Sequence, residues 1–242
     1  MAERAPTTMR PELRAIFERA EPADEQDLAA LEQRSQREAR RERLARSGIR
    51  LRPDDRKALM NDELYPTQAL RDVKRWLAAA TRTPNPGPNF LFVTGGTGLG
   101  KTVAAAWALT RQGGRFVTME TFLLDYARYL RDVSRDRAAE LERERYAAPG
   151  LLVLDELGTE ADAVLARTAL SWLVDARCAR RRHLTIVLSN LAEADVVARF
   201  TAGIYDPRTW DRLRRDGAFA KLDGESLRRP DYDAAAPRRS AP

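Results

Sequence analysis

Short, uninterrupted apolar runs alternate with amphipathic stretches through the middle of the chain. Four of these runs predict buried strands, at residues 90–94, 116–119, 151–155 and 184–190. Unbroken apolar runs of this length are typical of parallel strands that are covered on both faces. Apolar residues at helical spacing, or an alanine-rich composition, predict helices over residues 67–77, 101–112, 121–132 and 164–181. This alternation predicts an α/β fold with a parallel, doubly wound sheet.

The first 64 residues have a different pattern. Between Arg34 and Arg56 there are nine arginines and four acidic residues, with few large apolar residues. Because such a segment buries little surface, we expect residues 1–64 to form a charged extension that is partly helical or disordered. Two interpretations stay open, a solvated arm and an arm that docks a partner protein. The ordered domain is expected over residues 65–228, followed by a disordered tail over residues 229–242.

Composition narrows the possible partners. The net charge is +6 and the isoelectric point is near 9.8, which makes nucleic acid a plausible partner. Cys178 is the only cysteine and His183 the only histidine, so we expect no zinc site. The chain has neither a secretory signal nor an apolar run long enough to cross a membrane, so we expect a cytoplasmic protein without a membrane partner.

A glycine-rich loop joins the first predicted strand to the next helix. Its eight residues match the phosphate-loop (Walker A) pattern in full: Gly95, Gly96, Thr97, Gly98, Leu99, Gly100, Lys101 and Thr102. Glycines let the backbone turn its N–H groups around phosphates, and the following helix points its positive end at them. We expect Lys101 to reach the terminal phosphates of ATP and the Thr102 hydroxyl to bind Mg²⁺.

Asp155 and Glu156 follow the third predicted strand, as expected of a Walker B motif. The carboxyl ends of parallel strands share one edge of a sheet, so both side chains are expected beside the phosphate loop. We expect Asp155 to hold Mg²⁺ together with Thr102, and Glu156 to polarise the water that attacks the γ-phosphate. The chain is therefore predicted to be a Mg²⁺-dependent ATPase that forms ADP and phosphate.

Two further polar features follow these motifs. Asn190 ends the fourth predicted strand at the same edge of the sheet, where an amide can orient the water or the γ-phosphate; a simple turn is the alternative. Arg208 and Arg212 are four residues apart and share one face of a helix. An arginine supplied by a neighbouring subunit stabilises the transition state of phosphoryl transfer. A solvated helix, paired with nearby aspartates, is the alternative for these two arginines.

These motifs, in this order, resemble the AAA+ ATPases and more narrowly the DnaC/IstB-type family of helicase loaders and transposition ATPases. The resemblance covers residues 43–228 and rests on residues 47–49, the phosphate loop, 151–158, 185–190, 208–213 and 224–228. It implies a P-loop NTPase with the five-stranded parallel sheet of AAA+ proteins. The short segment after Arg212 implies a reduced or absent C-terminal lid.

The resemblance also assigns roles to single residues. It implies that Asn190 is the sensor-1 residue, and that Arg212 is an arginine finger with Arg208 beside it at a subunit interface. Arg177, on the helix before the fourth strand, matches an arginine that is common in the family and is expected at the same interface. Whether Arg228 acts as a sensor-2 residue stays open.

The family acts on DNA as an assembly of identical subunits, so we expect a homo-oligomer that forms on ATP and DNA. Residues 126–131 interleave tyrosines with arginines, and in resembling loaders this helix contacts DNA. Arg128 and Arg131 are therefore DNA-binding candidates, although the aromatic residues around them are equally explained as core. Single-stranded DNA is the first expectation, and duplex DNA stays open.

The leading interpretation is an ATP-dependent replication protein that binds a replicative helicase through its N-terminal arm. Deletion of residues 1–56 is then expected to abolish helicase association and leave ATPase activity intact. The alternative is an IstB-like helper that binds DNA and recruits a transposase. A small-molecule kinase fits less well, because the chain has a sensor-like asparagine and a helix with paired arginines.

Overall fold

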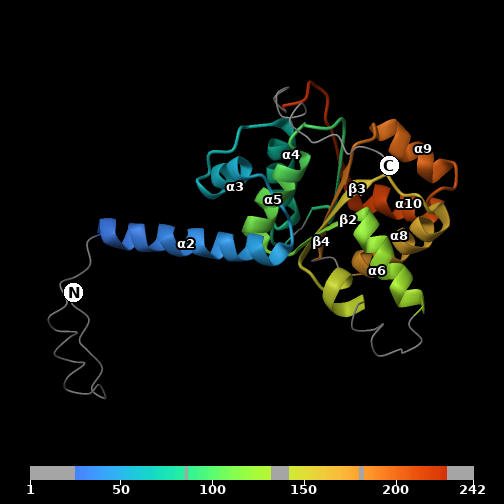
Figure 1. Ribbon diagram of the computed structural model, residues 1–242, viewed down its shortest axis with the longest axis horizontal. Helices are drawn as coiled ribbons and strands as arrows, with labels where there is room; N and C mark the ends of the chain where they lie inside the picture. The colour runs from blue at the N-terminus through green and yellow to red at the C-terminus, as the bar shows by residue number, and fades with distance from the viewer. Residues whose placement is uncertain (1–24, 85–86, 132–141, 180–182, 228–242) are drawn as a thin grey trace, which may run out of the picture. The chain divides into compact units, whose positions relative to one another are not determined.

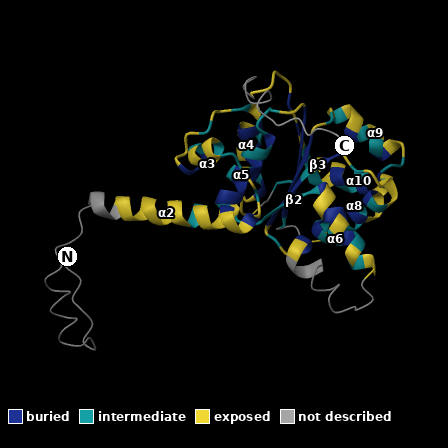
Figure 2. Cartoon of the chain, in the orientation of Figure 1, coloured by how far each residue is buried: buried dark blue, intermediate teal, exposed yellow. Residues whose placement is uncertain are grey.

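The computed structural model describes residues 25–84, 87–131, 142–179 and 183–227. The chain divides into two compact units, Met1–Ala39 and Arg40–Pro242. The first unit contains the beginning of helix α2 (Glu25–Ser47), whose residues 29–38 are all exposed (Figure 2). None of the helices in the described ranges is both long and apolar enough to cross a membrane.

The second unit is built on a parallel five-stranded sheet (Figure 1). Its strands are β1 (Phe90–Thr94), β2 (Arg115–Thr118), β3 (Leu151–Leu157), β4 (Leu184–Ser189) and β5 (Gly217–Lys221). Their spatial order is β2-β3-β4-β1-β5, and every neighbouring pair is parallel. The α/β fold class and the four strands expected from the apolar runs are confirmed. The residue pattern did not reveal β5, which reads Gly-Ala-Phe-Ala-Lys and contains little apolar surface.

Helices cover both faces of the sheet (Figure 1). Helices α4 (Gln68–Ala80) and α5 (Lys101–Gln112) pack on one face. The other face is covered by α6 (Met119–Arg131), α8 (Ala163–Cys178), α9 (Glu193–Thr201) and α10 (Pro207–Asp216). The remaining described helices are α3 (Pro53–Met60) and a π-helical turn, η1 (Glu142–Ala147).

The alternation of side chains along β1 explains the two cores. Leu91 and Val93 pack with α4 and α5, whereas Phe90 and Phe92 pack with the helices of the opposite face. All five residues of β1 are buried, because both faces of this central strand are covered. This packing holds the end of β1 at Thr94 in place within the sheet. The phosphate loop begins at the next residue, Gly95.

Side-chain caps set the starts of three helices. The Thr67 hydroxyl accepts a hydrogen bond from the N–H of Leu70 at 3.0 Å, which fixes the start of α4. Asp162 caps α8 in the same way. Asp206 caps α10, whose first residue is a proline with its φ already suited to a helix.

Residues 40–64 belong to the second unit, so the expected domain boundary at residues 64 and 65 is wrong. Leu44, Leu59 and Met60 are buried and form a small core with Ala106 of α5. Asp62 pairs with Arg40 and Arg111, which ties this segment to the end of α5. Spaced apolar residues are thus enough to anchor a segment that reads as charged overall. The tail 229–242 and Arg228 lie outside the described residues.

Candidate nucleotide-binding site

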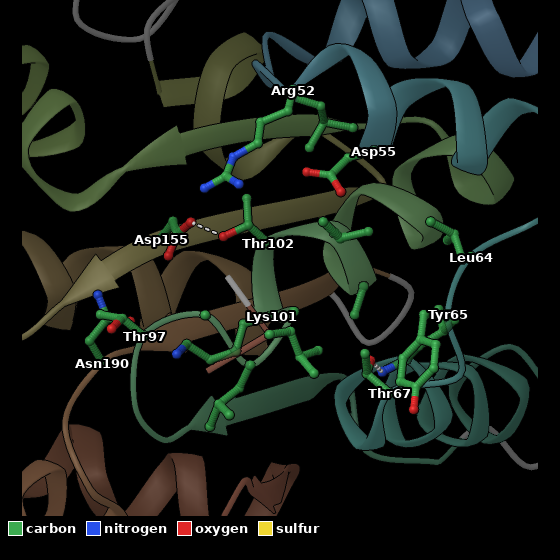
Figure 3. Close-up of a pocket in the computed structure, with 18 of the residues that line it drawn as sticks. Arg52, Asp55, Leu64, Tyr65, Thr67, Thr97, Lys101, Thr102, Asp155 and Asn190 are labelled. Atoms are coloured by element: carbon green, nitrogen blue, oxygen red, sulfur yellow. Dashed lines mark hydrogen bonds between the residues drawn. The ribbon is translucent and has the colours of Figure 1, made fainter. Parts of the chain in front are cut away.

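A cavity of about 610 Å³ lies where the carboxyl ends of β3 and β4 meet the phosphate loop (Figure 3). The predicted residues that line it are Thr97, Gly98, Leu99, Gly100, Lys101, Thr102, Asp155, Glu156 and Asn190. These residues come from three strand ends and the first turn of α5. The parallel sheet brings them together because its strands all end at one edge.

The backbone of the phosphate loop requires its glycines. Gly98 and Gly100 have φ values of +80° and +81°, a region that favours glycine. A Cβ atom on Gly98 would also lie 2.0 Å from the Ser226 hydroxyl oxygen. At Gly96 a Cβ atom would meet nothing within 4 Å, so the loop is open there. The loop can therefore turn its backbone N–H groups toward a bound phosphate at the N-terminus of α5.

The Lys101 side chain is almost fully buried under this loop. Its ammonium donates hydrogen bonds to the carbonyl oxygens of Gly95 and Gly96, both at 2.6 Å. These bonds hold the positive charge close to the loop. A flexible lysine with carbonyl partners can turn toward phosphate oxygens, which are stronger acceptors.

Thr102 and Asp155 form the pair that a magnesium site needs. The Thr102 hydroxyl donates to Oδ2 of Asp155 at 3.0 Å, although 53 residues separate them in the chain. Burial raises the pKa of Asp155, partly offset by hydrogen bonds from the Glu156 N–H and Thr102 and by the charge of Lys101. On acidification, this carboxyl therefore loses its charge at a higher pH than an exposed aspartate. A hydroxyl and a carboxylate oxygen side by side are hard ligands that fit Mg²⁺.

Glu156 has a left-handed backbone conformation, with φ of +66°. Its N–H donates to Oδ1 of Asp155 at 2.8 Å, and its carbonyl oxygen accepts from the Thr159 hydroxyl at 2.9 Å. Its side chain is exposed at the wall of the cavity. An exposed carboxylate at this position can accept a proton from a water molecule beside the phosphates.

Asn190 directly follows β4 and lines the cavity, where it lies beside Thr97 and on the same side as Asp155 (Figure 3). The residue before it, Ser189, is buried and donates to the Leu157 carbonyl oxygen at 2.6 Å. This bond fixes the end of β4 to the end of β3. The amide of Asn190 is thereby placed within the same cavity as Lys101 and Glu156.

Residues 50–70 supply one wall of the cavity, which the sequence pattern did not predict. This wall consists of Arg50, Leu51, Arg52, Asp55, Leu64, Tyr65, Thr67 and Leu70. The guanidinium of Arg52 is directed toward the Thr102–Asp155 pair, and Tyr65 stands at the far end (Figure 3). Nothing in the spacing of nine arginines distinguishes Arg52 from its neighbours. A tyrosine two residues before a helix cap was the only available signal.

A C-terminal strap, residues 222–227, covers the other side of the phosphate loop. The N–H of Leu227 donates to the Gly98 carbonyl oxygen at 3.0 Å, and the N–H of Leu222 donates to the Thr94 carbonyl oxygen at 2.8 Å. Gly95 has φ of +137°, and a Cβ atom there would lie 2.4 Å from the Leu222 carbonyl oxygen. The motif at residues 224–228 thus reaches the site through its described part.

The sequence matches no protein-family model. No curated protein matches it either. Solved structures do match. The DnaC helicase loader aligns over 67% of this chain and 95% of its own, with 18% identity and a TM-score of 0.52. Domain III of the Thermotoga maritima replication initiation protein DnaA aligns over 73% and 70%, with 17% identity and a TM-score of 0.52.

A third structure, the replication initiator DnaA bound to AMPPCP and single-stranded DNA, covers 74% of this chain and 53% of its own. Its identity is 17% and its TM-score 0.50. The chain therefore shares its fold with the DnaC helicase loader and with domain III of DnaA. In the described residues after β5, 222–227, the chain forms no helix.

The expected interface role of Arg177 is wrong. This arginine is fully buried inside the second unit. Its guanidinium donates to the Thr185 hydroxyl at 2.6 Å and to the carbonyl oxygens of Tyr146, Leu184 and Pro149. A buried charge held by this many acceptors joins α8 to the start of β4 and cannot reach a neighbouring subunit. The sequence around Arg177 resembles the family pattern, but the Arg177 side chain points into the core.

Arg208 and Arg212 lie on α10, outside the set of residues that line the cavity of their own chain. Arg212 forms an ion pair with Asp175 of α8, and both side chains are about half exposed. Arg208 is exposed. Because exposed ion pairs contribute about 0–1 kcal/mol, Arg212 can exchange this partner for a stronger one.

Helix α6 separates its aromatic and basic residues. Phe122 and Tyr126 are buried in the core, with their ring centroids 6.1 Å apart. Arg128 and Arg131 are exposed, and Arg128 makes a loose ion pair with Asp125 at 3.8 Å. The tyrosine at position 126 therefore serves packing. The two arginines remain accessible on the surface.

Proposed function

We propose that this chain is an ATP-dependent DNA-replication protein of the helicase-loader type, which binds and hydrolyses Mg²⁺-ATP. The observation that carries the ATPase proposal is one cavity shared by the Lys101 ammonium, the Thr102–Asp155 pair, the Glu156 carboxylate and the Asn190 amide. These groups provide what phosphoryl transfer to water needs, which is charge stabilisation and a positioned proton acceptor.

Each part of the nucleotide has a matching surface in the cavity. The phosphates fit the glycine loop and Lys101, at the N-terminus of α5. The base fits the wall formed by Leu51, Leu64 and Tyr65, where apolar and aromatic groups can cover a purine face. Thr102 and Asp155 would hold Mg²⁺, which neutralises phosphate charge when it is bound.

In the proposed reaction, the oxygen of a water molecule forms a bond to the γ-phosphorus while Glu156 accepts its proton. The bond between the γ-phosphorus and the bridging oxygen breaks, and its electron pair leaves with ADP. Asn190 orients the water or a γ-phosphate oxygen. Arg212 of a neighbouring subunit, with Arg208 beside it, stabilises the charge that spreads over the γ-phosphate. Hydrolysis then depends on assembly.

The partners are proposed from the sequence motifs and the fold. The structures that share this fold include a protein named as a helicase loader and an initiator bound to AMPPCP and single-stranded DNA. We therefore propose DNA and a replicative helicase as partners, with Arg128 and Arg131 on the DNA surface. Alanine at both arginines should weaken binding of single-stranded DNA and reduce its salt slope by roughly 0.7 for each phosphate that is no longer neutralised. Alanine at Arg75, an exposed arginine of α4, is the matched control.

The ATPase proposal is tested by ATP binding and turnover in the purified full chain. Lys101→Ala should weaken ATP binding, since it removes the ammonium that lies under the phosphate loop. Glu156→Gln should bind ATP normally and lose turnover by roughly 10²–10⁴-fold, because an amide cannot accept the proton. A wild-type chain that does not hydrolyse ATP, with or without single-stranded DNA, would overturn the proposal. Co-purification with the replicative helicase tests the partner independently of turnover.

A further inference from the structure

Glu160 lies four residues after Glu156, outside the cavity, and its carboxylate is almost fully buried with 2% of the side chain exposed. Its Oε1 atom accepts a hydrogen bond from the backbone N–H of Gly158 at 2.8 Å. Its Oε2 atom accepts from the Tyr205 hydroxyl at 2.7 Å, and the Arg199 guanidinium lies 3.6 Å away. A buried carboxylate is costly unless it is paired in this way, and removal of one partner disturbs the others.

The Gly158 N–H belongs to residues 156–160, which we call the catalytic loop because they begin with Glu156. Glu156 and Gly158 both have positive φ values, +66° and +105°. Gly158 adopts such a φ without steric cost, but Glu156 has a Cβ atom and keeps this conformation only where the surroundings fix it. The Thr159 hydroxyl holds the carbonyl of Glu156, and Glu160 holds the N–H of Gly158. A Cβ atom on Gly158 would lie 2.4 Å from Leu191, so this loop is also packed closely against the end of β4.

The other end of the Glu160 network reaches α9 and α10. Tyr205 is fully buried, and its ring lies against Phe200 of α9 with centroids 4.9 Å apart. Burial and the hydrogen bond to Glu160 raise the pKa of Tyr205, so its hydroxyl stays a neutral donor. Tyr205 directly precedes Asp206, whose carboxylate caps α10. The Glu160 carboxylate thus connects the catalytic loop, through Tyr205, to the start of the helix that carries Arg208 and Arg212.

We infer that Glu160 is a positioning residue for ATP hydrolysis, which holds the catalytic loop to Tyr205 and Arg199 so that Glu156 faces the attacking water. The inference rests on the proposed ATPase function. Glu160 acts through the backbone and lies outside the cavity, so its loss should affect the catalytic step more than ATP binding. A displacement of Glu156 by about 1 Å is enough to lower the rate by roughly 10²-fold.

Four variants of the full chain test this role, with kcat and KM for ATP measured separately and folding followed by thermal melting. Glu160→Ala should lower kcat by about 10–100-fold and change KM less than about twofold. Tyr205→Phe, which removes one hydroxyl, should lower kcat by about 3–10-fold with KM unchanged. Glu160→Gln should retain kcat within about threefold, since its amide can accept from Gly158 and donate to the Tyr205 oxygen. Glu120→Ala, an exposed glutamate of α6, is the matched control.

The outcomes separate this inference from the proposed function. Lower kcat in Glu160→Ala and Tyr205→Phe, with rescue by Glu160→Gln, supports the positioning role. Wild-type kcat in both variants, even with lower melting temperatures, overturns it and leaves a purely structural network. If Glu160→Ala does not fold, Tyr205→Phe decides the result. A wild-type chain without turnover overturns the proposed function and this inference together.

Discussion

At the scale of single residues, the backbone of Glu156 is unusual, because its φ of +66° lies in a region that residues with a Cβ atom rarely adopt. Such a conformation costs about 1–3 kcal/mol and persists mainly at functional sites. Hydrogen bonds from the Glu156 N–H to Asp155 and from the Thr159 hydroxyl to the Glu156 carbonyl offset part of this cost. The strain and the exposed carboxylate thus occur at the same residue, beside the Thr102–Asp155 pair.

Two substitutions at Glu156 distinguish the backbone strain at this residue from the role of its carboxylate as proton acceptor. Glycine adopts this φ without steric cost, so Glu156→Gly should be more stable than Glu156→Gln by about 0.5–1 kcal/mol. That difference corresponds to a melting temperature about 1–4 °C higher for a chain of this size. Both variants should lose turnover, because neither side chain accepts a proton. Equal melting temperatures would contradict the strain, and turnover near the wild-type rate in either variant would contradict the role of Glu156 as proton acceptor.

At the scale of elements, helix α10 combines a fixed start with an exposed face. Asp206 caps its first turn, and Thr209 and Leu213 are buried against the body of the protein. Arg208 is exposed on the remaining surface, and Arg212 makes its exposed pair with Asp175 there. A rigid helix with releasable arginines is suited to completing a site on another subunit.

The trans role of α10 predicts complementation between subunits. Arg212→Ala should bind ATP normally and lose most hydrolysis, by roughly 10³-fold or more if the arginine acts as a finger. Mixing it with Glu156→Gln should restore part of the activity, because some interfaces then combine an intact Glu156 with an intact Arg212. Arg214→Ala, an exposed arginine of the same helix, is the matched control. Full activity of Arg212→Ala as an isolated subunit would refute the trans role.

At the scale of the whole molecule, the cavity draws on segments that are far apart in the chain. Residues 50–70 form one wall, the phosphate loop and the ends of β3 and β4 form the centre, and Leu227 of the C-terminal strap closes one side. The proposed nucleotide site therefore depends on residues that look like part of a charged extension in the sequence. This changes which deletion can test the N-terminal arm.

Deletion of residues 1–39 is the appropriate truncation, since it follows the boundary between the two compact units. It should abolish association with the helicase, if residues 1–39 carry the docking site, and leave ATPase activity close to that of the full chain. Deletion of residues 1–56 should instead weaken ATP binding and lower the melting temperature, because it removes Leu44 from the core and Arg52 from the cavity. Pull-down, ATP titration and thermal melting check these outcomes. Retained helicase association in the shorter deletion would place the docking site elsewhere.

The phosphate loop, the strand that precedes it, and the carboxylates of Asp155 and Glu156 could all be predicted from local sequence. These features are contiguous, and each depends on local backbone geometry: an unbroken apolar strand, glycines at the turn, and polar residues where the strand ends. The order of strands and helices also predicted the parallel sheet, and that the polar residues would gather at the carboxyl ends of its strands. Local patterns were sufficient because the relevant residues lie next to one another in the chain.

Which isolated residues line the cavity became clear from the folded structure. Arg52 and Arg177 both lie in or near arginine-rich sequence, yet one lines the cavity and the other is buried in the core. Glu160 and Tyr205 are 45 residues apart, and nothing in either local sequence indicates that they form a hydrogen bond. The physical reason is that burial and long-range hydrogen bonds arise from packing between elements, which a pattern along the chain does not encode.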